Sequence, residues 1–352
     1  NRKMIKKISD KLYQLFVTNT YAMAIQCDDG RYMTRYLPVT SLMIEEMLIN
    51  KGSMGCYQQC YKSNMLRWIC FDFDCPDKNN PDVAGLYESA VVPFTAILKK
   101  YHINYLTEFS GRRGIHVWIV FDSLIPKKEA YQILFALKQE FLSGMKSDSV
   151  IHIDYFPATD SARGNVVGKQ VKLPLSWHKN GGRSWLFEEH FVPIDRYEGT
   201  EFYENQLEIL EKYECNKYED VCSALEIENS EFLNRLKYKR YKVFGQIEIT
   251  IADAISILSE TKVYQFIFNR MSQGQAMRRD WTVLLGTFAY CDESGNFIRE
   301  LFSLFPNYDL KKTTENVEKY RDKYYPATFE YLYHLYDLSL IHISEPTRLD
   351  VI

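Results

Sequence analysis

The stretch Leu66–Asp74 (LRWICFDFD) is the part of the sequence that most constrains the fold. Its apolar residues and short length predict a buried strand, and a strand places successive side chains on opposite faces. Asp72 and Asp74 therefore share one face, while Phe71 and Phe73 point into the core. Two carboxylates this close repel each other and favour a divalent cation. A strand with a solvated acidic face remains the alternative for this motif taken alone.

The residues around this strand predict a mixture of strands and helices. The expected strands are Tyr21–Cys27, Gly52–Tyr61, Asn104–Phe109, Ile115–Phe121, Ile151–Phe156, Val171–Leu175 and Ser184–Phe187, and the expected helices are Pro38–Asn50, Asp82–Tyr101 and Lys127–Leu142. Gly52–Tyr61 is expected to pair with Leu66–Asp74 as a hairpin. The mixture predicts an α+β fold with a layered, mixed α/β domain.

The second candidate motif is Ser110–Trp118 (SGRRGIHVW). A glycine-rich turn with Arg112 and Arg113 precedes a strand, and its N–H and guanidinium groups suit a phosphate chain. Alternation places His116 on the face opposite to its two apolar neighbours. A hairpin turn with solvated arginines and a core histidine is the alternative.

The third candidate motif is Ile151–Pro157 (IHIDYFP), which carries an isolated acid. Asp154 lies between apolar residues on an expected strand, an unfavourable place for an unpaired charge. His152 shares its face. An ion-paired or edge-exposed aspartate is the alternative.

A basic segment follows at Ser161–Phe187, which contains no acidic residue although the chain has a net charge of −3. Its cations are Arg163, Lys169, Lys172, Lys179 and Arg183, interleaved with Trp177, Trp185 and Phe187. Cations attract a phosphate backbone and aromatic rings stack on bases. The residues predicted to bind nucleic acid are Lys169, Trp177, His178, Lys179 and Arg183. A solvated basic hairpin is the alternative.

Length and composition exclude several classes of protein. The chain has 352 residues, of which 46% are hydrophobic and 25% charged, as in a globular protein of about two domains. No apolar run reaches the ~18–20 residues that span a bilayer, and no secretory signal opens the chain, so we expect a cytoplasmic protein without a membrane partner. The eight cysteines form no CxxC pair. Reduced thiols are therefore favoured over structural zinc, for which the candidate ligands would be Cys56, Cys60, Cys70 and Cys75.

Four segments are expected along the chain. Residues 1–195 hold the motifs, residues 196–245 form an acidic helical connector, and residues 246–338 form a helical C-terminal domain. In that domain Arg270, Arg278, Arg279 and Trp281 form a basic cluster that is a candidate contact for nucleic acid or a nucleotide, and a solvated helix face is the alternative. Residues 339–352 (SLIHISEPTRLDVI) resemble translated sequencing-adapter sequence, so we expect a non-native tail and give it no role. The first residue is Asn1 rather than Met, so we expect that the sequence is a fragment.

Taken in order, the motifs resemble those of the archaeo-eukaryotic primase (prim-pol) superfamily, and most closely the primases of TOTE conflict systems and CRISPR-associated primase-polymerases. FDFD, SGRRGIHVW and HIDYFP correspond to its acidic strand, histidine strand and third-acid strand, and Gly164-Asn165 with KLPL at 172–175 resembles the TOTE pattern. The resemblance covers about residues 21–187. It implies a two-part mixed α/β catalytic core, with an RRM-like sheet that carries metal-binding acids, followed by a small all-helical domain.

The resemblance also implies roles for individual residues. Asp72, Asp74 and Asp154 correspond to catalytic ligands of two divalent ions, Mg²⁺ or Mn²⁺. The implied nucleotide-binding residues are Ser110, Arg112, Arg113, Gly114, His116, Arg163 and Lys172. Gly114 departs from the family pattern, because relatives have serine there, so backbone N–H groups must replace a hydroxyl contact.

The implied activity is that of a DNA primase-polymerase, which makes primers de novo on a template and extends them. Its partners would be a single-stranded DNA template, dNTPs or NTPs, and a helicase, nuclease or CRISPR proteins from a bacterial conflict system, mobile element or CRISPR locus. A metal-dependent nuclease is one alternative, although a nuclease does not need the triphosphate-binding basic residues. A non-catalytic single-strand binder is another, which the three acids disfavour because they repel a phosphate backbone.

Overall fold

The computed structural model describes residues 1–146, 151–161, 167–179, 181–191, 199–228, 230–243, 247–289, 292, 294–321, 323 and 326–338. The chain divides into two compact units, Asn1–Glu228 and Asn229–Ile352. Among the described residues, no helix combines the length and the apolar character needed to cross a bilayer.

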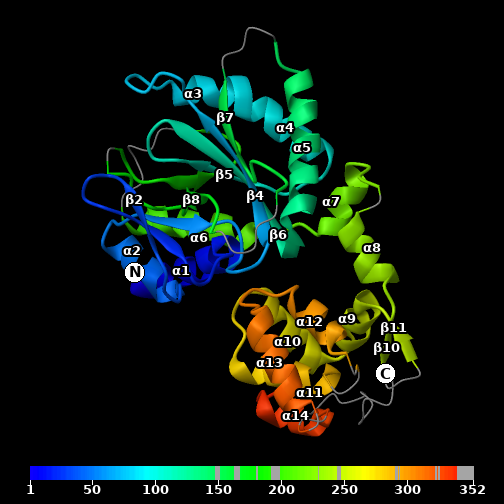
Figure 1. Ribbon diagram of the computed structural model, residues 1–352. Coiled ribbons are helices and arrows are strands. Elements are labelled where there is room, and N and C mark those ends of the chain that lie inside the picture. Colours follow the sequence, from blue (N-terminus) through cyan, green and yellow to red (C-terminus); the bar gives the residue numbers. More distant parts are fainter. Residues whose placement is uncertain are drawn as a thin grey trace. The chain divides into compact units, whose positions relative to one another are not determined.

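The described residues of the first unit form a five-stranded antiparallel sheet (Figure 1). Its order is β7 (His152–Phe156), β4 (Met65–Asp74), β6 (Gly114–Pro126), β5 (Leu106–Phe109) and β9 (Trp185–Phe187). The strand predicted around FDFD is confirmed as β4, which pairs with β6 on one side and β7 on the other. Strands with two neighbours and two covered faces can be apolar throughout, and most of β4 is buried.

Helices α4 (Val92–Lys100) and α5 (Lys127–Ser143) cover one face of this sheet (Figure 1). Phe71 and Phe73 point into this layer, as alternation predicted, and both are fully buried. The ring centroid of Phe94 on α4 lies 4.4 Å from that of Phe71 and 5.5 Å from that of Phe73. Such ring pairs add about 0.5–1.5 kcal/mol each beyond their buried area. The layer holds β4 so that its two acids face the other way.

The helix predicted at Asp82–Tyr101 is present in three consecutive pieces. These are α3 (Val83–Leu86), the π-helical turn η1 (Tyr87–Val91) and α4. Asp82 caps the start, because its carboxylate accepts a hydrogen bond from the backbone N–H of Gly85 at 2.9 Å.

A second sheet and three helices cover the other face of the first sheet. The described strands of this second, four-stranded sheet are β2 (Tyr32–Arg35), β1 (Met23–Gln26), β3 (Met54–Tyr57) and β8 (Gln170–Lys172), in that order. The helices are α1 (Arg2–Phe16), α2 (Ser41–Ile49) and α6 (Thr200–Lys212), which share one buried cluster with Trp68 and Trp118. Along β4 the cover ends between Cys70, which is fully buried, and Asp72, which is partly exposed. The polar site therefore begins where this core ends.

The predicted hairpin between Gly52–Tyr61 and Leu66–Asp74 is wrong. Strand β3 pairs with β1 and β8 in the second sheet, whereas β4 pairs with β6 and β7 in the first. An isolated bridge between Gln59 and Leu66 lies at the connection. Apolar patterning locates strands but does not select their partners. The sequence analysis also did not predict α1 and β2, which belong to the second layer.

The expected acidic connector contributes to both units. Helix α6 buries Phe202, Tyr203, Ile209 and Leu210 in the core of the first unit. Helix α7 (Tyr218–Ala224) belongs to the same unit, while α8 (Glu231–Tyr238) lies in the second. The glutamates of α6 lie on the exposed side of an amphipathic helix. The many acids of this part of the segment are therefore compatible with a helix that packs into the core on its other side.

The second unit is mainly helical, as its sequence predicted. After α8 come the hairpin β10 (Tyr241–Val243) and β11 (Ile247–Ile249), then α9 (Ile251–Ser259), α10 (Lys262–Ser272), α11 (Arg278–Phe288), α12 (Asn296–Phe302), α13 (Leu310–Tyr320) and α14 (Phe329–Leu335). The expected adapter-like tail, 339–352, lies outside the described residues.

Candidate active site

Four ionisable residues lie in one row across four neighbouring strands of the first sheet. Asp72 on β4 is the direct partner of Asp154 on β7 and of His116 on β6, and His116 is the partner of Glu108 on β5. Directly opposed residues of antiparallel strands point to the same face. The register therefore produces the order Asp154, Asp72, His116, Glu108, and so brings three of the predicted motifs together.

His116 is held between two carboxylates. Its Nδ1 lies 2.8 Å from Glu108 Oε2, and its Nε2 lies 3.3 Å from Asp72 Oδ1. Burial disfavours the charged ring, but the charges of Asp72 and Glu108 outweigh that effect and raise the pKa of His116 to about 10. His116 is therefore a buried imidazolium at neutral pH, with both ring nitrogens protonated.

Glu108 is a site residue that the sequence analysis missed. Its side chain is fully buried, and its Oε2 also accepts a hydrogen bond from Trp118 Nε1 at 2.8 Å. Its Oε1 has no hydrogen-bond partner within the described residues. The signal was available, because Glu108 is an isolated acid in the apolar strand LTEF, just as Asp154 is in HIDYF.

Lys172 reaches this row from the second sheet. Its Nζ donates a hydrogen bond to the carbonyl oxygen of Ser110, and the charges of Glu108 and Asp72 act on it. Burial lowers the pKa of Lys172, and the two acids partly offset that effect. Lys172, which the sequence analysis predicted as a nucleotide-binding residue, therefore lies next to the acids and contacts the turn that begins at Ser110.

Asp74 lies one step further along β4, opposite Gly114 on β6 and His152 on β7. Its Oδ2 pairs with Arg113 Nη2 at 2.7 Å. Burial and the neighbouring charge of Asp72 raise the pKa of Asp74 to about 6, although Arg113 acts in the opposite direction. A Cβ on residue 114 would lie 2.5 Å from Asp74 Oδ1. Glycine at this position therefore leaves room for the carboxylate over the strand.

Two glycine-rich loops pack backbone against backbone beside the row. Gly182 N–H donates to Gly111 O at 2.7 Å, and Gly111 has a φ of +91°. A Cβ on Gly111 would lie 2.5 Å from Gly182 O, so this approach requires glycine. The contact places His178 near Arg112 and Lys172, and burial together with these two cations lowers the pKa of His178. The predicted phosphate turn and the basic segment thus form one wall.

The residues predicted to bind nucleic acid differ in their surroundings. Lys169 and Lys179 are exposed, while Trp177 is partly buried with Lys51 and Arg183 over its ring at 5.2 and 4.9 Å. Arg183 also lies 4.4 Å from the ring of Phe202 and donates to Tyr203 Oη at 3.1 Å. Aromatic side chains thus surround Arg183. Arg163 and Gly164-Asn165 lie outside the described residues.

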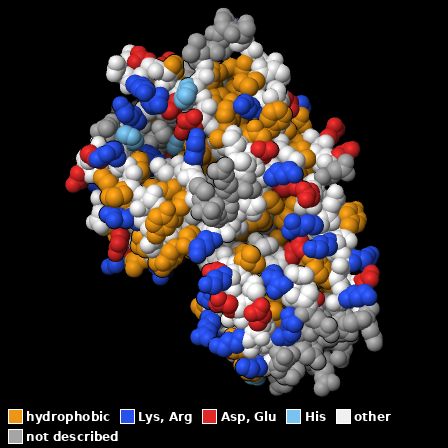
Figure 2. Space-filling model, in the orientation of Figure 1, with side chains coloured by type: hydrophobic (Ala, Val, Ile, Leu, Met, Phe, Trp, Pro, Cys, Tyr) orange, Lys and Arg blue, Asp and Glu red, His pale blue; other side chains and the backbone are white. Residues whose placement is uncertain are grey.

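The acids fit a divalent cation by their chemistry. Asp72, Asp74 and Asp154 offer carboxylate oxygens, the ligands that Mg²⁺ and Mn²⁺ prefer. Asp72 Oδ1 is buried yet has no well-formed hydrogen bond within the described part of the chain, and Asp154 is exposed. In the described residues these side chains do not form a ready-made group of three or more ligands. Figure 2 shows acidic, basic and histidine side chains gathered on one part of the surface, at upper left.

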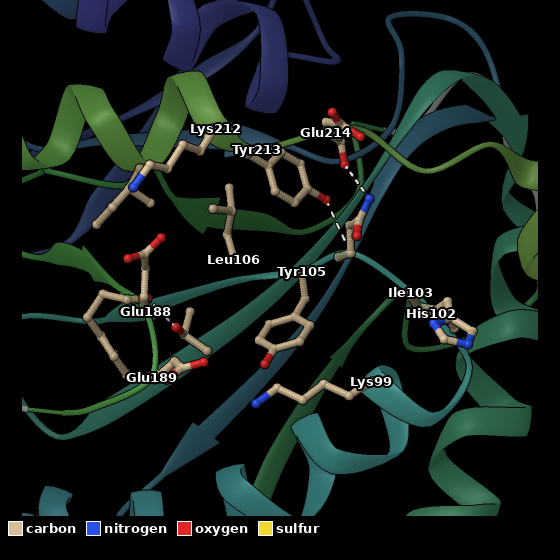
Figure 3. Close-up of a pocket in the computed structure, with 14 residues that line it drawn as sticks. Lys99, His102, Ile103, Tyr105, Leu106, Glu188, Glu189, Lys212, Tyr213 and Glu214 are labelled. Carbon is tan, nitrogen blue, oxygen red and sulfur yellow. Dashed lines mark hydrogen bonds between the residues drawn. The ribbon is translucent and has the colours of Figure 1, made fainter.

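A cavity of about 520 Å³ lies around Tyr105 and Leu106 (Figure 3). Its wall mixes the cations Lys99 and Lys212 with acids such as Glu188. It contains none of the predicted site residues and does not favour one sign of ligand charge.

The family model of the archaeo-eukaryotic primase domain of TOTE conflict systems matches residues 5–223. The chain belongs to this family. The family is one of primase-polymerase-like nucleotidyltransferases, and the match spans the first unit and all of the described motifs. The resemblance seen in the motifs is thereby confirmed. A search of curated proteins finds no significant match.

Two solved structures are similar to the chain at low identity. The archaeo-eukaryotic primase domain of the cyanophage S-2L primase-polymerase is 11% identical, with a TM-score of 0.32, over 58% of this chain and 88% of that chain. The polymerase domain of Mycobacterium tuberculosis ligase D, solved in complex with DNA, is 11% identical, with a TM-score of 0.35, over 67% of this chain and 90% of that chain.

Proposed function

We propose that this primase-family chain is a DNA primase-polymerase that makes primers de novo on single-stranded DNA and extends them with dNTPs or NTPs. The observation that carries the proposal is the row Asp154, Asp72, His116 and Glu108 with Lys172 beside it. It places carboxylates next to protonated groups, and a nucleotidyl transfer needs both.

Asp72, Asp74 and Asp154 would hold the divalent ions. The chemistry that bound Mg²⁺ or Mn²⁺ supplies is activation of the attacking 3′-hydroxyl and neutralisation of charge on the pyrophosphate. Asp72 is the central ligand in this proposal, since it lies between Asp154 and His116 in the register.

The cationic residues would orient the triphosphate. His116 is already charged and fixed by Glu108, so its geometry needs little change when a nucleotide arrives. Lys172, Arg112, Arg113 and the N–H groups of the Ser110–Gly114 turn would add charge-assisted hydrogen bonds. Glu108 does not reach the substrate in this proposal. It acts by holding His116 and by balancing the charge of Lys172.

The template would lie along the exposed cations of the basic segment, Lys169 and Lys179, with His178 and Trp177 beside them. We keep a helicase, a nuclease and CRISPR proteins as proposed partners on the family resemblance alone.

The test supplies the full chain with single-stranded DNA, labelled dNTPs and NTPs, and Mn²⁺ or Mg²⁺, without a primer. The D72A/D74A double variant is assayed beside it. Labelled oligonucleotides made by the wild type and not by the variant are the expected result. Extension of a supplied primer without de novo products would reduce the proposal to a polymerase. Template cleavage without synthesis would favour the nuclease, and binding without either reaction would favour the single-strand binder.

A further inference from the structure

The ion pair between Arg113 and Asp74 is a short contact at the proposed metal site, with 2.7 Å between Nη2 and Oδ2. Both side chains are mostly shielded from water, since 23% of Arg113 and 15% of Asp74 is exposed. Solvent and salt screen such a pair less than an exposed pair.

The backbone holds Arg113 in place. Cys75 N–H donates to Arg113 O at 2.9 Å, and the Arg113 Nη1 group donates to Cys75 O at 2.8 Å. The guanidinium therefore bridges Asp74 and the residue that follows it. Because Gly114 leaves space for Asp74 over the strand, the carboxylate can lie close to this guanidinium.

We propose that Arg113 is a built-in counter-cation of Asp74, which competes with the divalent cation for this carboxylate and so weakens metal binding in the absence of nucleotide. The inference rests on the proposed function, because it takes Asp74 as a metal ligand. It gives Arg113 a role at the metal side of the site before nucleotide binds, in addition to the triphosphate contact proposed above.

The physical argument is one of competition. Asp72 and Asp74 repel each other, and a cation that relieves this repulsion is bound by both. Arg113 already supplies part of that relief through a charge-assisted hydrogen bond. A divalent ion that takes Asp74 Oδ2 must first displace this guanidinium.

Arg112 is the matched control on the same loop. It has the same charge, but its side chain is exposed and acts on His178 rather than on Asp74. Removing either arginine changes the net charge of the site region equally. A difference between the two variants therefore reports the local pair rather than the general field.

The experiment measures Mn²⁺ binding to the full chain by electron paramagnetic resonance, without nucleotide or DNA. R113Q is expected to bind Mn²⁺ about three- to tenfold more tightly than the wild type, as the loss of a partly buried ion pair implies. R112Q and the conservative R113K are expected to stay within about twofold of the wild type. Equal or weaker Mn²⁺ binding by R113Q would overturn the inference.

Acidic variants separate this inference from the proposed function. D72N is expected to weaken Mn²⁺ binding strongly. When Asp74 is replaced by asparagine, R113Q is expected to have no further effect on the Mn²⁺ affinity. If D72N weakens binding while R113Q changes nothing, the metal assignment stands and the role of Arg113 falls. If D72N and D74N both bind Mn²⁺ as the wild type does, the metal assignment itself falls.

Discussion

Glu108 in the first unit and Asp280 in the second are both fully buried carboxylates, and they differ in how their oxygens are used. Asp280 caps the start of α11, because its Oδ2 accepts from Met277 N–H at 2.7 Å, and its Oδ1 accepts from Tyr336 Oη at 2.7 Å. Arg270 lies 3.5 Å away and supplies the opposite charge. Both oxygens of Asp280 have partners inside the unit.

Glu108 uses a single oxygen for its two donors, His116 Nδ1 and Trp118 Nε1. Its other oxygen has no partner among the described residues, although Lys172 is near enough for the two groups to interact. A buried carboxylate without full hydrogen bonding costs stability, so it persists where it does something else. The comparison teaches that burial alone does not mark a functional acid. The completeness of its hydrogen bonds separates the helix cap from the site residue.

The largest effect is expected for the cap in the second unit. D280A leaves Arg270 and the hydroxyl of Tyr336 without their carboxylate, which should lower the free energy of unfolding of this unit by about 3–5 kcal/mol. Chemical denaturation with probes for each unit measures it, because two units need not unfold together.

A cap on the surface of the same unit provides the control for D280A. Asp309 caps α13 by accepting from Lys312 N–H at 3.0 Å, and it is exposed. D309A should therefore cost about 1 kcal/mol. Equal losses for the two variants would mean that the buried partners of Asp280 add nothing to a simple cap.

The next effect concerns Glu108 and should appear in activity. E108Q keeps the shape of the side chain but removes one of the two charges that raise the pKa of His116, so primer synthesis should fall by about 10²-fold. The free energy of unfolding should fall as well, because the buried His116 loses one of its two carboxylate partners, so primer synthesis is compared at a temperature where both proteins are folded.

Glu129 offers a matched control for E108Q. It is a buried glutamate on α5 in the same unit, and its Oε2 accepts from Tyr218 Oη at 2.6 Å. E129Q should leave primer synthesis near the wild-type rate. If both glutamine variants lost activity equally, Glu108 would be one more structural acid and the comparison would fail.

The variants H116Q and D280A should differ in how their loss of stability depends on pH. The free energy of unfolding is measured with a chelator present. His116, the partner of Glu108, has its pKa raised from 6.5 to about 10 in the folded chain. The stabilisation from a group with a raised pKa is complete below pH 6.5 and is lost as pH rises through 10. The difference in stability between wild type and H116Q should therefore shrink from pH 6.5 to pH 10. The loss caused by D280A should stay nearly constant there, since burial and Asp280 raise the pKa of the partner Tyr336 above this range. A pH-independent H116Q difference would contradict the charged state of His116.

The sequence predicted most strands of the first unit and the direction of the side chains in FDFD, because alternation is a local property, but it did not predict β2, β10 or β11. FDFD placed Phe71 and Phe73 in the core and Asp72 on the other face, and the structure agrees. It could not predict that β3 and β4 belong to different sheets, because partner choice depends on the whole core.

The site was predictable only in part for the same reason. Asp72, His116 and Asp154 were recognised as separate motifs, and strand register is what aligns them. Glu108 was missed because LTEF has no motif around it, and its importance comes from its partner on β6. The pairing of Arg113 with Asp74 depends on a contact across two strands, which spacing along the chain does not show.

The smallest effects are predicted for two cations of one hairpin, Lys179 and Arg183, which differ in their internal contacts as the two buried acids do. Arg183 has internal partners in Trp177, Phe202 and Tyr203, whereas Lys179 is exposed on the same segment. K179A should weaken single-stranded DNA binding by about two- to threefold and reduce the slope of log K against log salt by about 0.7, which corresponds to one lost phosphate contact. R183A should instead lower thermal stability, because it removes a cation that packs between aromatic rings. Fluorescence anisotropy at several salt concentrations, with a melting curve for each variant, measures both effects. A lower salt slope for R183A without loss of stability would mean that Arg183, like Lys179, contacts nucleic acid. Internal contacts would then not distinguish a structural cation from a binding cation.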